Sequence, residues 1–298
     1  MAVTAEDVKA LRERTGAGMM ECKKALVEAN GNLEAAAEIM RKSGLAKADK
    51  KAGRIAAEGV IAIEKSADGR SAAVVEVNSE TDFVARENDF QAFATAVAKA
   101  ALAAQPASLD ALLATRLDSG QTVDEARRAL IARIGENIGV RRCDLIRSTG
   151  TLGTYLHGTR IGSVVALEGG DDTLARDLAM HVATISPQFV SADDVPAEQV
   201  SREREIFSAQ VAADPKAHGK PQDIIAKMVD GKMRKYLGEI TLTGQPFVRD
   251  DKVSVGDLLK SRKARVARFI RFEVGAGIEK KQENFADEVM AQAGLKKS

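Results

Sequence analysis

One stretch of the sequence combines residue types that could act on a partner molecule. Glu76 to Arg86 reads Glu-Val-Asn-Ser-Glu-Thr-Asp-Phe-Val-Ala-Arg and joins an apolar run to a helical pattern that begins at Phe90. Connections between a strand and a helix normally face solvent. A carboxylate, Asp82, therefore stands beside a large apolar ring, Phe83, on a short surface turn. The pair is typical of a probe aimed at a partner, although spacing alone also allows Phe83 to be a core residue in line with Phe90.

No catalytic or metal-binding pattern accompanies this stretch. The three histidines, His157, His181 and His218, are scattered, and none has the His-x-x-x-His or Cys/His spacing of a metal site. His181 falls on the apolar stripe of a predicted helix, where a structural histidine is expected. The sequence also lacks the phosphate-binding Gly-x-x-x-x-Gly-Lys-Ser/Thr motif and the Gly-x-Ser-x-Gly nucleophile motif. These absences favour a binding protein that uses no cofactor or metal over an enzyme.

Composition limits the partners that we expect. Charged residues make up 29% of the chain, but the net charge is only +1, whereas binding by phosphate neutralisation requires a strong basic excess. With no Trp and two Tyr, stacking on bases is not expected as the main mode of binding. We therefore expect no direct contact with nucleic acid. The basic stretch Leu45 to Arg54, interpreted as a linker, leaves a ribosome- or RNA-associated factor as the alternative.

Cysteine usage and hydropathy favour a cytoplasmic protein. Cys22 and Cys143 are far apart and have no Cys-x-x-Cys spacing, which is typical of two reduced thiols in the cytosol. The first residues include acids and no apolar leader, so we expect neither a signal peptide nor a transit peptide. No window is apolar for long enough to span a membrane.

Residues 1–54 predict a small, UBA-like module of three helices followed by a linker. Thr4-x-x-Asp7 resembles a capping box, and we expect Gly44 to end the third helix. Modules of this size usually bind another protein rather than carry out chemistry. Met19 and Met20 are adjacent and point in different directions. Either one lies in the core and the other packs in the loop, or the pair forms an adaptable apolar contact for a partner.

A hairpin, a helix and a returning strand occur twice in the rest of the chain. The first set has strand-like runs at 60–63, 72–77 and 140–146 and helical patterns from the 76–86 stretch through Ala104, at 107–117 and at 123–134. The second has strand-like runs at 151–155, 161–167 and 268–274 and a helix at 171–185. We therefore predict an α+β fold with two related core subdomains, 55–147 and 148–186 plus 238–276.

Two segments fall outside these subdomains. Residues 187–237 carry one apolar stripe on each of two helical patterns, which predicts an inserted antiparallel hairpin that zips as a coiled coil and projects roughly 20 Å. It could be a plain structural insertion or an arm for dimerisation or partner contact. Residues 277–298 predict a C-terminal helical module that packs on the body or reaches a partner.

The stretch Glu76 to Arg86 closely resembles a signature of the bacterial translation elongation factor Ts family, the guanine-nucleotide exchange factors of elongation factor Tu. Leu11 to Leu26 matches the other signature of that family. Further similarity runs through 134–138, 157–158, 179–182, 242–248 and 269–274. The resemblance covers essentially the full chain and is weakest in the Ala-rich residues 100–119.

The resemblance implies a function and a set of contact residues. The chain would bind the GDP-bound form of elongation factor Tu and promote exchange of GDP for GTP during translation elongation, and its helical hairpin would serve partner contact or self-association. Thr81, Asp82, Phe83 and Val84 would enter the GTPase domain beside the Mg²⁺ of the nucleotide. The implied docking residues are Met19, Met20 and Lys23 on the same domain and His157 on another domain of the partner.

Overall fold

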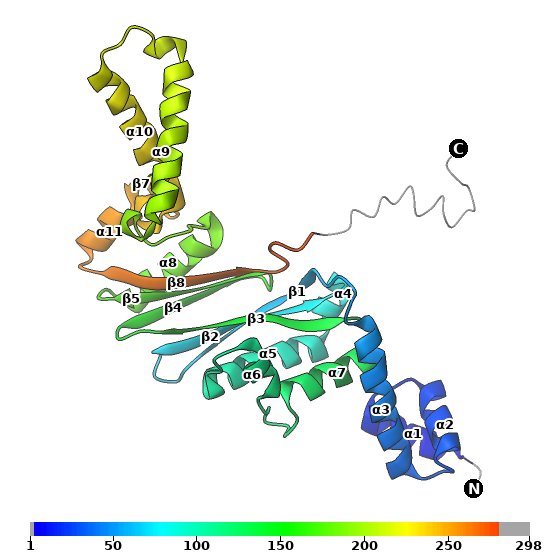
Figure 1. Ribbon diagram of the computed structural model, residues 1–298. Coiled ribbons are helices and arrows are strands. Elements are labelled where there is room, and N and C mark those ends of the chain that lie inside the picture. The colour runs from blue at the N-terminus through cyan, green and yellow to red at the C-terminus, as the bar shows by residue number, and fades with distance from the viewer. Residues whose placement is uncertain (1–2, 280–298) are drawn as a thin grey trace, which may run out of the picture.

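The computed structural model describes residues 3–279, except for the side chains of residues 45–49 and 217. The expected C-terminal module, 277–298, therefore lies outside the described residues from position 280 onward. The described chain is elongated: a three-helix module stands at one end, two sheets lie in the middle, and a helical arm extends from the other end (Figure 1).

The N-terminal module consists of α1 (Ala5–Thr15), α2 (Met19–Glu28) and α3 (Leu33–Lys51). The capping box at Thr4 is present, because its hydroxyl accepts from the Asp7 N–H at 3.1 Å and the Asp7 carboxylate accepts from the Thr4 N–H at 3.0 Å. Six buried apolar residues form the small core: Val8, Leu11, Cys22, Ala25, Leu26 and Ala36.

The third helix does not end at Gly44, so that prediction is wrong. The helix α3 continues to Lys51 and packs against α7 (Val123–Ile134). A Cβ on Gly44 would lie only 3.0 Å from the Cβ of Ala132, so the glycine allows the two helices to approach closely. This packing offsets the cost of a helical glycine, about 1 kcal/mol. The basic stretch 45–54 is consequently helical as far as Lys51 rather than a linker.

The first subdomain is a three-stranded antiparallel sheet of β1 (Glu58–Lys65), β2 (Ser71–Ser79) and β3 (Ile138–Arg147), in that order. The helices α5 (Asn88–Ala104), α6 (Leu109–Ala114) and α7 cover one face. Side chains alternate along β2, so that Ala73, Val75 and Val77 face these helices. The single helix predicted through Ala104 is divided into α4 (Asp82–Ala85) and α5.

The second subdomain repeats the arrangement with β4 (Thr151–His157), β5 (Ile161–Glu168) and β8 (Arg265–Glu273), covered by α8 (Asp172–Ile185). The two sheets pack face to face through a third apolar cluster that includes Val74 of β2 and Val164 of β5. In the second subdomain, Gly169-Gly170-Asp171 connects the hairpin to the helix, and this connection has no counterpart of the 81–84 turn. The α+β class and the two related subdomains are confirmed.

Several short elements between 190 and 264 were not predicted, because two to seven residues are too few to show a period. They are β6 (Pro246–Phe247), β7 (Asp250–Ser254), α11 (Val255–Ser261) and the 3₁₀ turns Ala192–Asp194, Pro215–Ala217 and Leu242–Gly244.

The structural role predicted for His181 is confirmed. Its buried imidazole lies within α8 and contacts the segment that contains β6: Nε2 donates to Oε1 of Gln245 at 3.0 Å, and Nδ1 accepts from the Val248 N–H at 3.2 Å. Burial lowers the pKa of His181, against the smaller opposing effect of the Gln245 hydrogen bond. The neutral ring thus ties α8 to β6.

The arm is the helical hairpin expected from residues 187–237. Its helices are α9 (Ala197–Ala213) and α10 (Gln222–Ile240), joined through the 3₁₀ turn at 215–217. Val211 and Val229 are buried between them, with Phe207, Ile225 and Met228 packed around. The hairpin stands out from the sheets (Figure 1). None of the helices in the described part of the chain has the length and apolar character needed to cross a membrane.

Candidate functional site

The 81–84 turn presents an aromatic ring to solvent. Phe83 is 76% exposed, whereas Phe90 is fully buried in the first subdomain, so the alternative that places Phe83 in the core is wrong. Asp82 lies beside it and pairs with Arg86 one helical turn later, at 2.7 Å between Oδ2 and Nη2. Exposure of a large ring on an otherwise well-packed subdomain is typical of a surface that binds a partner.

The base of the turn is held firmly. The hydroxyl of Thr81 caps α4 by accepting from the Val84 N–H at 3.4 Å, and Val84 is buried in the core of the first subdomain. The Thr81 N–H and hydroxyl both donate to the carboxylate of Glu136, at 3.0 and 2.8 Å. Thr81 and Val84 therefore fix the turn, and Asp82 and Phe83 form its exposed tip. Glu136 was not predicted as a site residue, since its contact with Thr81 arises only on folding.

His157 lies across a groove from this tip. It is exposed where β4 ends, and its ring stacks on Tyr155 with the centroids 6.4 Å apart. A cavity of about 580 Å³ is lined by Asp82 and Arg86 on one side and by the turn His157 to Arg160 on the other. The fold thus brings together two predicted contact sites that are 75 positions apart in the chain (157 − 82).

Main-chain bonds hold the His157 turn beside the first subdomain. The Ile61 N–H of β1 donates to the carbonyl of Thr159 at 2.8 Å, and the Val274 N–H donates to the carbonyl of Arg160 at 2.9 Å. Arg160 also forms an ion pair with Glu58. The Ile61 bond and the Arg160–Glu58 ion pair join this turn to β1 of the first subdomain, and the Val274 bond lies within the second subdomain.

The predicted docking residues of the N-terminal module form a second exposed surface. Met19 and Met20 open α2 and are 58% and 71% exposed, and Lys23 is exposed one turn later. Neither methionine belongs to the core, so the interpretation that buries one of them is wrong. The module lies at one end of the molecule (Figure 1).

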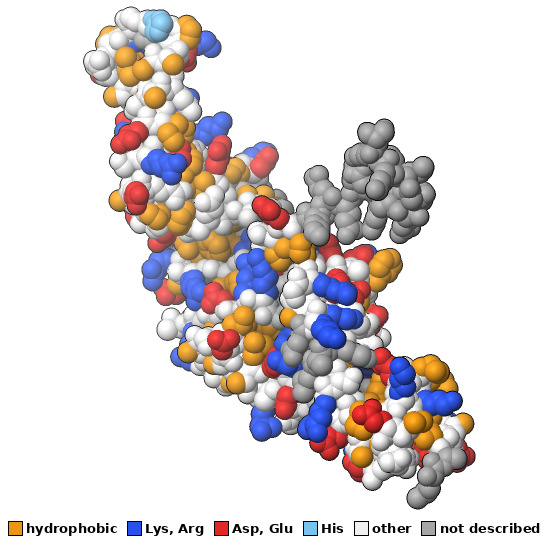
Figure 2. All heavy atoms as spheres, turned by 45° about the vertical axis from the view of Figure 1, so that its right-hand side comes forward, with side chains coloured by type: hydrophobic (Ala, Val, Ile, Leu, Met, Phe, Trp, Pro, Cys, Tyr) orange, Lys and Arg blue, Asp and Glu red, His pale blue; other side chains and the backbone are white. Residues whose placement is uncertain are grey.

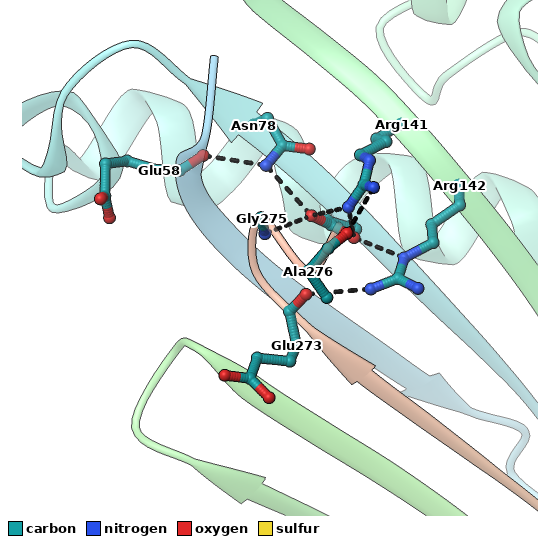
Figure 3. Close-up of polar contacts among 8 residues, drawn as sticks. Glu58, Asn78, Arg141, Arg142, Glu273, Gly275 and Ala276 are labelled. Atoms are coloured by element: carbon teal, nitrogen blue, oxygen red, sulfur yellow. Dashed lines mark hydrogen bonds and ion pairs between the residues drawn. The ribbon is translucent and has the colours of Figure 1, made fainter. Parts of the chain in front are cut away.

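The first residue of the 76–86 stretch, Glu76, carries a buried carboxylate. Glu76 is fully buried between the sheets and accepts from Arg141, Arg142, Asn78 and the Gly275 N–H, the last at 2.8 Å. Figure 3 shows these donors converging from β2, β3 and the segment after β8. Burial by itself raises the pKa of Glu76, but the bonds from Gly275, Arg142 and Asn78 outweigh it and lower the pKa. The ionised group links both subdomains.

On the face drawn in Figure 2, charge is distributed rather than gathered into one strip. Acidic and basic side chains are interspersed over the face in Figure 2. In the stretch 45–54, Lys51 donates to the carbonyl of Gly135 and Arg54 pairs with Glu80 at 3.5 Å. Within the described residues, no group of three or more His, Cys, Asp and Glu side chains could hold a metal ion.

An exposed aromatic tip on a clamped base, a facing groove and a separate methionine surface define a factor that recognises another protein. Comparison with known proteins identifies the family. The family model for elongation factor TS matches residues 80–276. The elongation factor Ts of Alkalilimnicola ehrlichii is 58% identical over 294 residues, with 98% of this chain and 99% of the relative covered. That of Thioalkalivibrio sulfidiphilus is 58% identical over 295 residues, with 98% and 99% covered, and that of Hydrogenovibrio crunogenus is 57% identical over 297 residues, with both chains fully covered.

The chain belongs to the elongation factor Ts family. Membership implies a role in translation elongation, as a nucleotide exchange factor.

Proposed function

We propose that this chain binds elongation factor Tu in its GDP-bound form and inserts Asp82 and Phe83 next to the Mg²⁺ of the nucleotide site. Release of GDP and its exchange for GTP during translation elongation in the cytoplasm would follow. The observation that carries the proposal is Phe83, 76% exposed on a turn whose base is hydrogen-bonded and buried. Family membership supplies the class of partner.

The energy of Phe83 burial is of the size that the proposal needs. A GTPase holds its nucleotide through backbone donors, a lysine on the phosphates and a bridging Mg²⁺. Filling a pocket with one Phe side chain contributes roughly 1.5–3 kcal/mol, which corresponds to roughly 10- to 100-fold in affinity. A pocket present only in the distorted nucleotide site turns this energy into a bias toward the distorted state. Asp82 would add repulsion to the polar network around the metal.

The same coupling returns the factor to solution. If the exchange protein weakens the affinity for the nucleotide by a given ratio, the nucleotide weakens the affinity for the exchange protein by the same ratio. Incoming GTP therefore displaces the factor and completes the cycle. This mechanism involves no covalent chemistry, because only binding free energies are exchanged.

Each segment of the chain has its own role in this proposal. Residues 1–54 dock on the GTPase domain through Met19, Met20 and Lys23. Residues 55–147 carry the tip, and His157, from the subdomain 148–186 plus 238–276, contacts another domain of the partner. The hairpin 187–237 contacts the partner or a second copy of the chain.

Release of fluorescent GDP from purified elongation factor Tu tests the proposal. The wild-type chain should accelerate release strongly. Phe83→Ala should lose at least about tenfold of this acceleration, because the wedge is removed. The variant should unfold at the wild-type temperature, since an exposed ring contributes little to folding.

Ile185→Ala is the matched control, because Ile185 is also exposed and apolar but lies outside the proposed contacts. It should leave the acceleration unchanged. Full activity of Phe83→Ala would exclude the wedge mechanism, and no acceleration by wild type would exclude the function.

A further inference from the structure

The turn between α7 and β3, Gly135 to Asn137, contacts three parts of the molecule at once. Glu136 contacts Thr81 at the base of the tip. Asn137 contacts both the chain just beyond α3 and Glu80, the residue before Thr81. We call it the 135–137 turn. The proposed function uses none of these residues directly, although the two surfaces that it invokes lie on either side of this turn.

Glu136 sets the conformation of the tip through Thr81. Its two carboxylate oxygens accept one bond each from Thr81, from the hydroxyl at 2.8 Å and from the N–H at 3.0 Å. Because the hydroxyl proton points to Glu136, its lone pair is free to accept from the Val84 N–H and start α4. The direction of α4 in turn determines where Phe83 points. Glu136 thus acts on the ring through the helix cap.

Asn137 sets the direction of the N-terminal module. Its side-chain amide donates to the carbonyl of Arg54 at 2.7 Å and to that of Ala52 at 3.4 Å, just beyond the last residue of α3. In return, Lys51 of α3 donates to the carbonyl of Gly135 at the end of α7. Polar contacts thus run in both directions between the C-terminal end of α3 and the turn that follows α7.

Glu80 completes the connection. Its Oε1 accepts from the Asn137 N–H, and its Oε2 pairs with Arg54 at 3.5 Å. Close packing of Gly44 against Ala132 adds a second point of contact between α3 and α7. The module is thus attached to the first subdomain at more than one place, and the 135–137 turn takes part in most of the polar contacts.

We propose that Glu136 and Asn137 are positioning residues: Glu136 aims Phe83, and Asn137 holds the Met19–Met20 surface at a fixed angle to the tip. This inference rests on the proposed exchange function. A rigid connection between two contact surfaces raises the effective concentration of the second contact once the first has formed. A displacement of Phe83 by about 1 Å in the bound complex should lower the rate of GDP release even when binding persists. The two residues should consequently affect different kinetic parameters.

The first experiment measures release of fluorescent GDP from elongation factor Tu as a function of factor concentration. Glu136→Ala should lower the rate at saturation about 5- to 10-fold, the effect of losing about one hydrogen bond at the tip. The half-saturating concentration should change less than about twofold. In a Phe83→Ala background, Glu136→Ala should have no further effect, because it acts through the ring. Glu136→Gln retains one acceptor and should be intermediate.

Asn137→Ala should show the opposite pattern. Its half-saturating concentration should rise about 5- to 10-fold, with the saturating rate retained, since the tip is intact and only preorganisation of the docking surface is lost. Asp118→Ala removes an exposed carboxylate from the same subdomain and should match wild type in both parameters. Thermal unfolding of every variant identifies loss of structure.

A second measurement needs no partner. Nitroxide labels on Lys24→Cys and Glu87→Cys report the distance between the module and the tip region by pulsed electron resonance. Labelling at pH 7.5 favours the introduced residues, because Cys22 is buried and burial, with the Asp144 charge, raises the pKa of Cys143 to about 11. Asn137→Ala should broaden the distance distribution, and Asp118→Ala should not.

The outcomes separate this inference from the proposed function. If the wild-type chain fails to accelerate GDP release, the function is wrong. If wild type is active and Asn137→Ala keeps both its distance distribution and its half-saturating concentration, the role of Asn137 is wrong. If Glu136→Ala lowers the rate equally with and without Phe83, the residue acts on folding and not on the tip, and its positioning role is wrong.

Discussion

Phe83 and Glu76 lie in one short stretch, and both depart from the rule that apolar side chains are buried and charged side chains are exposed. The aromatic ring is exposed, and the carboxylate is completely buried. Each exception has a physical reason that involves binding: Glu76 is satisfied by donors from three segments of this chain, whereas Phe83 has no apolar cover within the described chain. The buried residue thus holds the fold together, and the exposed one is available to a partner.

Glu76→Gln should lower the free energy of unfolding at pH 7 by about 2 kcal/mol, because it leaves Arg141 and Arg142 without their buried counter-charge. The pKa of Glu76 is lower in the folded chain than its ordinary value of 4.5. The unfolded chain therefore takes up the proton first. The contribution of Glu76 to stability is complete above pH 4.5 and is lost as the pH falls below it, so the decline over this range should be shallower in Glu76→Gln.

Urea unfolding at pH 7 and at several values between about 5 and 3 measures both effects. Glu64→Gln, on the neighbouring strand β1, is the control and should change stability by less than about 0.5 kcal/mol. Equal stability of Glu76→Gln and wild type at pH 7 would show that the network contributes nothing to folding.

At the scale of elements, glycines determine how closely a helix approaches a sheet. A Cβ on Gly153 of β4 would lie 2.0 Å from the carbonyl oxygen of Ala175 in α8. Real Cβ atoms never approach backbone so closely, so α8 rests directly on the strand at this point. By contrast, a Cβ on Gly139 of β3, in the first subdomain, would have no atom within 4 Å.

Gly153→Ala should therefore destabilise the protein by about 3 kcal/mol or more, since α8 must move away from β4. Gly139→Ala should change stability by less than about 1 kcal/mol. Thermal or urea unfolding of the two variants compares them directly. Similar stability in both would mean that α8 can shift without loss of packing.

The elements also show how far sequence periodicity extends. Both hairpins, α5, α7, α8 and the arm were predicted because each has several turns or strand residues with one apolar face, and the helical pattern at 107–117 predicted the shorter α6. Gly44 was misread as a helix end, since its packing against Ala132 lies 88 positions away (132 − 44). The strands β6 and β7 were missed because two and five residues show no period.

At the scale of the molecule, the N-terminal module, which carries the methionine surface, and the first subdomain, which carries the tip and one wall of the groove, are successive parts of an elongated body (Figure 1). A partner would contact these apolar and mixed-charge surfaces at separate places. The net charge of +1 and the interspersed charges in Figure 2 provide no large electrostatic attraction. Binding that depends on apolar insertion is only weakly screened by salt.

Affinity for elongation factor Tu·GDP should accordingly fall less than about threefold between about 50 and 200 mM KCl, whereas a factor that neutralises six or more phosphates would lose about a thousandfold. Equilibrium titration at several salt concentrations distinguishes these cases. A steep salt dependence, together with binding to RNA of equal strength, would favour the ribosome- or RNA-associated alternative over apolar insertion.

Local patterns were sufficient for the longer helices and strands, for the repeated subdomain and for the position of the turn that carries Asp82 and Phe83, because caps, periods and turn residues act between neighbours in the chain. Three features depended on the folded chain: the clamp of Glu136 on Thr81, the groove that sets His157 opposite Asp82, and the burial of Glu76 under Gly275. Each joins residues more than 50 positions apart. Their partners are chosen by how sheets and helices pack, and no local spacing records that choice.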